Sequence, residues 1–297
     1  MNRRELLHGA MLSAGLAAAG CSRGAAAWAE EPVAKPQSSE NQERKPEAAK
    51  KKIVLIGGNP DHPPGTHLYM RECGLLAKCL RQTPGVEAVV SNGWPKDAKV
   101  LEGVSALAFY SNPGAEHLFA PDHAEKAEAL LKSGVGLAAL HWGTGIGDSN
   151  NAKLVERYID ALGGAFGSWS RYVFSQSRIK QLDPKHPICR GWSDFDLKDE
   201  WYLNMRLKPE VKPLAQVRYE EKDQAVDQVV MWTYERKDSN GGRSYTNTLG
   251  HYHENFGLEP IRKSMLNGIL WTAHCEIPEG GVPCAITAED MKLEKNS

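Results

Sequence analysis

The sequence lacks the features that mark several common classes of protein. Its 297 residues contain 36 lysines and arginines against 37 aspartates and glutamates, a formal charge of −1, with no basic run in the part expected to fold. This balance argues against a nucleic acid partner. The uncharged apolar stretch at residues 10–20 is too short to cross a bilayer as a helix. The six cysteines include no CxxC pair, and the chain has no internal repeat.

The N-terminus has the pattern of an export signal. Paired arginines at 3–4 precede the weakly apolar residues 10–20, which predicts a twin-arginine signal over residues 1–29. A small-x-small motif favours cleavage after Ala29. An imperfect lipobox offers an alternative, in which Cys21 carries a lipid anchor. Either way, we expect a periplasmic or other extracytoplasmic location.

The remaining chain divides into a linker, one domain and a tail. Residues 30–50 are polar, charged and proline-bearing, which predicts a disordered linker. Residues 51–275 are long enough for one α/β domain with a substantial core, and residues 276–297 look irregular. Cys275 and Cys284 suit a disulfide in an oxidising compartment, although buried free thiols fit equally well.

Within the domain, the first half alternates short buried strands with helices. This rhythm predicts right-handed crossovers and a flavodoxin-like, mostly parallel sheet with helices on both faces. Strand-like stretches dominate the second half and predict an antiparallel extension of that sheet. The expected strands are 53–58, 86–90, 104–110, 136–140, 172–181, 200–207, 212–219, 228–234 and 243–249, and the expected helices are 68–82, 121–132, 151–162 and 257–273.

Histidines follow three of the expected strands. His67 lies in the loop after the first strand, His141 directly follows the fourth, and His251 comes just past the last. Because ligands bind beyond the carboxyl ends of parallel strands, these three side chains are expected to meet. Three imidazoles suit Zn²⁺ or a similar divalent metal; the alternative is a metal-free pocket whose histidines bind a ligand. His62 and His253 are second-choice ligands or proton-transfer groups.

Carboxylates and aromatic residues supply further candidates. Asp199 and Glu200 could act as ligand, general base or orienting group, or could form a surface acidic pair. We select Glu200, His62 and Asp199 as catalytic candidates. Aromatic rings offer flat faces for stacking sugars, although core packing explains any one of them equally well. The substrate-binding candidates are Trp142, Tyr202, His253 and Trp201.

Four motifs in order resemble the ThuA-like (trehalose-utilisation) family over roughly residues 51–275. They are HPPGTHLY at 62–69, GLAALH at 136–141, HPI at 186–188 with DEWY at 199–202, and GRSYTNTLGH at 242–251 with NGILW at 267–271. The resemblance implies a fold similar to class I glutamine amidotransferases and a role in carbohydrate metabolism, with disaccharides or their keto derivatives as ligands.

The resemblance does not extend to amidotransferase chemistry. Those enzymes carry a catalytic cysteine on a sharp turn after a strand, and the corresponding turn here places His141 at that position. Cys73 and Cys79 are expected inside a helix, so neither can replace the nucleophile. The sequence therefore favours an exported, metal-assisted hydrolase, lyase or isomerase of a sugar or keto-sugar. The alternative is a non-catalytic periplasmic module that binds a sugar or serves as a scaffold.

Overall fold

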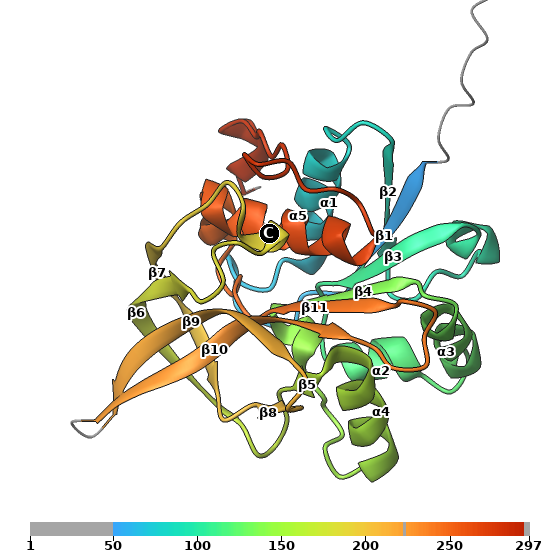
Figure 1. Cartoon of the computed structure of the whole chain (residues 1–297), viewed down its shortest axis with the longest axis horizontal. Coiled ribbons are helices and arrows are strands. Elements are labelled where there is room, and N and C mark those ends of the chain that lie inside the picture. Colours follow the sequence, from blue (N-terminus) through green and yellow to red (C-terminus); the bar gives the residue numbers. More distant parts are fainter. Residues whose placement is uncertain (1–49, 222–223, 294–297) are drawn as a thin grey trace, which may run out of the picture. The chain divides into compact units, whose positions relative to one another are not determined.

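A nine-stranded mixed sheet organises the protein (Figure 1). The computed structural model describes residues 50–221 and 224–293, which belong to one compact unit. The predicted export signal, the lipidation site at Cys21 and all but the last residue of the predicted linker lie outside the described residues.

The first half of the sheet is parallel, with the strand order β2-β1-β3-β4-β11. This is the 2-1-3-4-5 order of flavodoxin-like sheets, so the predicted fold class is confirmed. The strands are β1 (Lys51–Gly57), β2 (Val86–Asn92), β3 (Val104–Phe109), β4 (Gly136–Leu140) and β11 (Arg243–Asn247). β1, β3 and β4 are almost wholly buried, as expected of strands covered on both faces.

The second half continues the sheet with antiparallel pairs in the order β10-β9-β6-β7. These strands are β6 (Arg171–Gln181), β7 (Phe195–Leu203), β9 (Lys212–Glu221) and β10 (Gln224–Glu235). The strand predicted over 200–207 ends early because Asn204 adopts a left-handed backbone with φ 58°. A separate two-stranded ladder joins β5 (Gly164–Ala165) to β8 (Arg206–Leu207).

Helices cover both faces of the parallel half, as predicted. α1 (Tyr69–Leu80) and α5 (Glu259–Thr272) bury their apolar residues against one face. α2 (Gly114–Phe119), α3 (Ala124–Lys132) and α4 (Ala152–Leu162) cover the other. None of the helices within 50–221 and 224–293 is long and apolar enough to cross a membrane. Short 3₁₀ turns lie at η1 (Ala98–Leu101), η2 (His141–Thr144), η3 (Pro187–Cys189), η4 (His253–Gly257) and η5 (Glu289–Met291).

The helix predicted over 121–132 ends at Lys132 as predicted, but it begins three residues later than expected. The chain instead forms α2 before Pro121 and starts α3 at Ala124. Ala120 is extended, with ψ 144°, because a residue before proline is pushed out of the helical region. That extended residue ends α2, so Pro121 lies in the turn between two helices.

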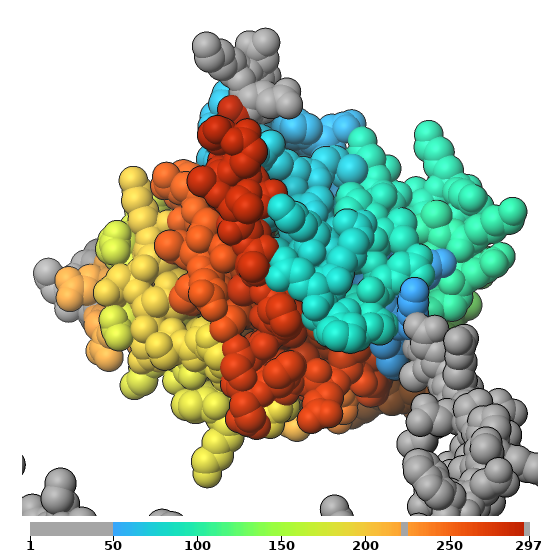
Figure 2. Space-filling view, turned by 90° about the horizontal axis from the view of Figure 1, so that it is seen from above, coloured from blue at the N-terminus to red at the C-terminus, as the bar shows by residue number. Residues whose placement is uncertain are grey.

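The C-terminal segment, defined as residues 276–293, packs across α1 and α5. Figure 2 shows it in dark red between the cyan first half of the chain and orange α5. Arg262 of α5 donates to the carbonyl of Cys284, and the amide side chain of Gln82 exchanges two hydrogen bonds with Ala285. All cysteines in the described part of the chain are free thiols, so Cys275 and Cys284 form no bridge in this structure.

Candidate metal centre

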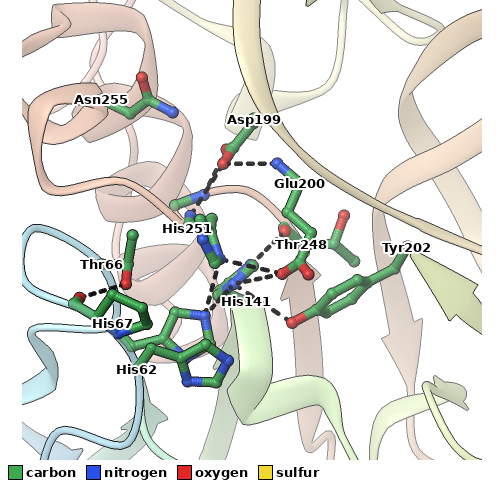
Figure 3. Close-up of polar contacts among 12 residues, drawn as sticks. His62, Thr66, His67, His141, Asp199, Glu200, Tyr202, Thr248, His251 and Asn255 are labelled. Carbon is green, nitrogen blue, oxygen red and sulfur yellow. Dashed lines mark hydrogen bonds and ion pairs between the residues drawn. The ribbon is translucent and has the colours of Figure 1, made fainter. Parts of the chain in front are cut away.

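Four donor side chains from separate parts of the chain meet at the carboxyl ends of the parallel strands (Figure 3). His67 lies between β1 and α1, His141 follows β4, and His251 follows β11. The fourth donor, Glu200, comes from β7 of the antiparallel half. All four side chains are buried, each at most 5 % exposed. The structure therefore brings together the three histidines predicted as ligands and adds a carboxylate to them.

The distances between the donor atoms fit a single metal ion. His67 Nε2 lies 2.9 Å from His141 Nε2 and 3.0 Å from His251 Nδ1. Glu200 Oε2 lies 3.2 Å from each of those two partners, His141 Nε2 and His251 Nδ1. Tetrahedral ligands about 2.1 Å from a zinc ion stand about 3.4 Å apart, so small outward shifts of the rings suffice. Three imidazoles and one carboxylate suit Zn²⁺ or another first-row divalent ion.

Two of the ligand histidines have unusual backbone conformations. His67 and His141 both have φ 48°, a left-handed region that costs a residue with a side chain about 1–3 kcal/mol. At His141 this conformation makes the sharp turn from β4 into η2. Gly143 allows the turn to pack closely, since a Cβ there would lie 2.5 Å from the carbonyl oxygen of Phe109. The strand-end turn thus points the His141 imidazole toward His67 and Glu200.

Hydrogen bonds behind the rings fix which nitrogen faces the centre. His141 Nδ1 donates to the carbonyl of Thr248 at 2.9 Å, which leaves its Nε2 lone pair free. His67 Nδ1 lies 2.6 Å from the Tyr69 hydroxyl, which in turn donates to Asp61 at 2.9 Å. Such carboxylate–histidine arrangements hold metal ligands in their tautomer and orientation.

The protonation states also favour metal binding. Burial, together with the neighbouring His141, His62 and His251, lowers the pKa of His67 far below its ordinary value. Burial alone would raise the pKa of Glu200, but hydrogen bonds and charge from His141 and His251 lower it to about 2. A neutral imidazole and an ionised carboxylate are the forms that bind metals.

Of the roles predicted for Asp199, its position fits the orienting group. Its buried carboxylate accepts three backbone N–H groups, from Glu200 and His251 at 3.0 Å and from Gly250 at 2.8 Å. Along β7 it alternates with Glu200, so it does not line the pocket. This placement does not support a catalytic role, because Asp199 instead ties the His251 loop to β7.

A pocket of about 200 Å³ opens beside the four donors. Trp142 and Tyr202, two of the predicted substrate-binding residues, line it, and Tyr202 Oη lies 3.3 Å from His141 Nε2. His62 also lines it, with its ring tilted by 33° against that of His67, 3.6 Å between ring centroids, and hydrogen-bonded to Asp61 at 2.7 Å. The lining residues are His62, His67, Trp142, Phe166, Tyr172, Phe174, Glu200 and Tyr202.

Two predicted substrate-binding residues lie elsewhere. Trp201 is fully buried in the core, and its indole donates to Ser175, because it points to the opposite face of β7 from its two neighbours. His253 was expected near the pocket or facing solvent. It is buried instead, with its ring between Glu72 of α1 and the carbonyl of Met291. Both predictions are corrected.

Other pocket residues were missed. Tyr172 and Phe174 on β6 are 57 % and 50 % exposed and pair across the strands with Tyr202 and Glu200. Alternation along two paired strands would have placed all four on one face. Asp61 was also missed, since nothing in its loop sequence shows that it contacts two histidines and a tyrosine.

The cysteines take no part in the site. Cys73 and Cys79 lie inside α1, as predicted, and neither lines the pocket. Burial raises the pKa of the Cys73 thiol and raises that of Cys79 to about 11, so both thiols stay protonated. Neither thiol is therefore placed to act as a nucleophile in this pocket.

Fold and site together define a flavodoxin-like α/β protein with a buried histidine–carboxylate centre. The model of the ThuA family, described as trehalose utilisation, matches residues 66–272, and the chain belongs to this family. The matched range contains His67, His141, Glu200 and His251. His62 and Asp61 precede it.

Comparison with solved structures agrees on the fold. A ThuA-like protein from Bacteroides uniformis is 16 % identical, with 77 % of this chain and 94 % of that chain covered and a TM-score of 0.55. A glutamine amidotransferase from Thermotoga maritima is 8 % identical, with 75 % of this chain and 96 % of that chain covered and a TM-score of 0.41. No curated protein matches the chain.

Proposed function

We propose that this protein is a metal-dependent enzyme that acts on a sugar or keto-sugar bound beside the histidine–carboxylate centre. The observation that carries the proposal is the convergence of four buried donor atoms, 2.9–3.2 Å apart, at the wall of an aromatic pocket. Membership of a family described by trehalose utilisation supports a carbohydrate ligand. Aromatic walls beside polar groups are typical of sugar sites.

Different residues of the site serve ligand binding and proton transfer. A divalent ion held by the four donors would polarise a carbonyl or hydroxyl oxygen of the sugar. Phe174 and Trp142, which line the pocket, would contact the sugar with their aromatic rings. His62, oriented by Asp61 and reachable from solvent, takes up and returns the proton that hydrolysis, elimination and isomerisation all require. Burial and the nearby Glu200 raise the pKa of Tyr202, so its hydroxyl remains a hydrogen-bond donor.

Elemental analysis of protein purified without chelator tests the metal. We expect close to one divalent ion per chain, and loss of that ion in His141→Ala. His274→Ala is a matched control, because it also replaces a histidine with positive φ but lies at the end of α5, outside the pocket. A wild-type protein without metal, or metal retained by His141→Ala, would contradict the proposal and favour the metal-free pocket.

A non-catalytic sugar-binding or scaffold module is the alternative, favoured by the half-exposed rings of Tyr172 and Phe174. Incubation of the metal-loaded protein with sugars and their keto forms, followed by mass spectrometry, separates the two functions. New products that disappear in His62→Gln support an enzyme. Saturable binding without any product supports the module.

We also propose that the protein works outside the cytoplasm, because paired arginines precede its apolar N-terminal stretch. Twin-arginine export carries folded proteins, which suits a metal bound before transport. The intact mass of the mature chain tests this and distinguishes cleavage after Ala29 from lipidation at Cys21. A full-length chain retained in the cytoplasm would contradict export.

A further inference from the structure

A hollow of about 260 Å³, called here the Arg236 hollow, lies away from the metal centre. Its walls come mainly from α3, α4 and residues 236–239 after β10. The Arg236 guanidinium donates to the carbonyl of Val135, directly before β4, whereas His141 directly follows that strand. The length of β4 separates the two places by roughly 17 Å, at about 3.3 Å per residue. The hollow is therefore a separate feature at the opposite edge of the parallel sheet.

Arg236 is a buried cation without an acidic partner. It is only 9 % exposed, and none of the ion pairs among the described residues includes it. Burial lowers the pKa of Arg236 to about 10, so the guanidinium is still charged at neutral pH. Because a buried charge is costly unless it is paired, this position favours a bound anion.

Neutral acceptors fix the Arg236 guanidinium and leave one of its donors over. Nη1 donates to the Arg243 carbonyl and the Ser244 hydroxyl, and Nη2 donates to the carbonyls of Leu131 and Val135. These bonds tie the end of α3 to β11, which is a structural role. The Nε–H group is also buried but has no hydrogen-bond partner within residues 50–221 and 224–293. The structural role therefore accounts for four N–H groups and not for the fifth.

A second donor of the same kind lines the hollow. Arg157 Nε is buried without a partner in the described part of the chain, while its Nη2 pairs with Glu128 at 2.6 Å. The Arg157 guanidinium lies 4.6 Å from the centre of the Phe119 ring, which limits its movement. Lys132, also in the lining, is exposed. Two guanidinium N–H groups and one ammonium group thus line one space, and such charged donors form the stronger hydrogen bonds to anions.

The charges of the lining limit the ligand to one negative charge. The lining contains four cations and three carboxylates, a net charge of +1: Lys132, Arg157, Arg236 and Lys237 against Glu128, Asp160 and Asp238. Two of these groups have partners outside the lining, since Asp160 pairs with Lys208 and Lys237 pairs with Glu210 at 2.8 Å. A dianion would meet these three carboxylates with only one net positive charge to balance it.

The apolar part of the lining indicates an organic anion. Phe119, Leu131 and Ala161 contribute apolar surface, which an inorganic ion cannot use. Pockets for drug-sized ligands measure roughly 300–1,000 Å³, so this hollow suits a smaller molecule. We infer that the Arg236 hollow binds a small organic monocarboxylate, whose carboxylate accepts from the Nε–H groups of Arg157 and Arg236. The apolar body of the ligand contacts the Phe119 side of the hollow.

Titration of the full chain with benzoate, followed by NMR of the arginine Nε–H groups, tests this site. Arg157→Lys and Arg236→Lys assign the two signals. We expect both signals to shift, with a Kd of about 1 mM for so small a ligand. Benzamide has nearly the same shape without the charge and should bind about tenfold more weakly. Inorganic phosphate, which has no apolar body, should also bind more weakly than benzoate.

Two substitutions locate the binding. Arg236→Lys keeps the charge but removes the Nε–H group and should abolish benzoate binding, with thermal unfolding reporting whether the variant folds. Lys132→Glu changes an exposed residue of the lining and should weaken benzoate binding about fivefold. Lys126→Glu makes the same charge change at an exposed position of α3 outside the lining, and it should behave as wild type. The Lys132 comparison decides the matter even if Arg236→Lys does not fold.

The contrary results are equally specific. Equal affinities for benzoate and benzamide, or unchanged Nε–H signals of both arginines, would overturn the anion site. Tighter binding of phosphate than of benzoate would overturn the organic carboxylate. Equal effects of Lys132→Glu and Lys126→Glu would place the binding outside the Arg236 hollow. Metal content and sugar binding do not enter this test, so its outcome is independent of the proposed function.

Discussion

The parallel and antiparallel halves of the sheet contribute differently to the site. The parallel half supplies His67, His141 and His251 from loops at its strand ends. The antiparallel half supplies rings from the strands themselves, above all Phe174 and Tyr202, which face the pocket. Its strands leave large aromatic surface exposed, whereas the central parallel strands are covered on both faces.

This difference indicates a division of labour. Positions at the ends of parallel strands are fixed by the topology of a rigid core, which suits atoms that must meet within a few tenths of an ångström. Exposed positions along an antiparallel strand can vary without disturbing that core. We interpret the parallel half as the part that binds the metal and the antiparallel half as the part that selects the ligand. Glu200 is the one donor to the centre that comes from the antiparallel half.

The largest expected effect comes from removing a donor of the parallel half. His67→Ala should weaken metal binding about 100-fold or more, since one of four ligands carries about 3 kcal/mol of the roughly 10–16 kcal/mol of a zinc site. Competition with a chromogenic chelator measures the change. His62→Ala, in the same loop, is the control and should retain the metal. Equal losses in both variants would contradict the assignment of His67 as a ligand.

A smaller loss of metal affinity is expected when a residue that orients a ligand histidine is changed. Tyr69→Phe removes the hydroxyl that links His67 to Asp61 and should weaken metal binding about tenfold, as is usual for groups that orient a ligand. The same competition assay applies. Tyr245→Phe, also buried in the parallel half but bonded to Ser264, should leave the affinity unchanged. An equal effect of both changes would indicate general loosening of the core.

For the antiparallel half we expect the opposite pattern, in which sugar binding weakens and metal content stays the same. Phe174→Ala should weaken methyl α-glucoside binding about fivefold, the equivalent of roughly 1 kcal/mol of ring contact, without changing metal content. Gln176→Ala, two residues further along the same face of β6, is the control. Loss of metal in Phe174→Ala would show that the two halves are not separable.

The smallest effect concerns the C-terminal segment. Hydrogen bonds from Lys78 and Thr287 lower the pKa of Asp290 from 3.8 to about 2, so its ionised form favours the docked segment. Its contribution is complete above about pH 5 and is lost as the pH falls through about 2. Amide protection of residues 285–292, corrected for intrinsic exchange, should therefore decline slightly from pH 6 to pH 3. In Asp290→Asn, the amides of residues 285–292 should be less protected at pH 6, and their protection should change less as the pH falls to 3. Equal protection in both proteins would contradict a role for this ion pair.

The convergence of the three histidines could be predicted from the sequence because it depends on topology. Alternating strands and helices predict a parallel sheet, and such a sheet brings its strand ends together. His67, His141 and His251 therefore reach the same edge of the sheet, and their loops set how the rings point. The rings of Tyr172 and Phe174 were also predictable, since their alternation follows from that of Glu200 and Tyr202 on the paired strand.

The remaining site residues depend on loop geometry that no periodicity encodes. His253 and His251 are two residues apart, yet η4 turns one toward α1 and leaves the other at the metal centre. Asp61 reaches His62, His67 and Tyr69 only because its loop folds back over the start of α1. Trp201 lies in the core for a simpler reason: side chains alternate along β7, so it points away from the face that carries Glu200 and Tyr202.

The docking of the C-terminal segment has a consequence for the stability of the candidate metal centre. The carbonyl of Met291 holds His253, and those of Asp290 and Lys292 hold Arg71, so this segment secures the turn that follows His251. The support for the third strand-end turn of the centre thus comes from outside the sheet. Loss of these hydrogen bonds should loosen the loop that carries His251 without changing any of the four donor side chains.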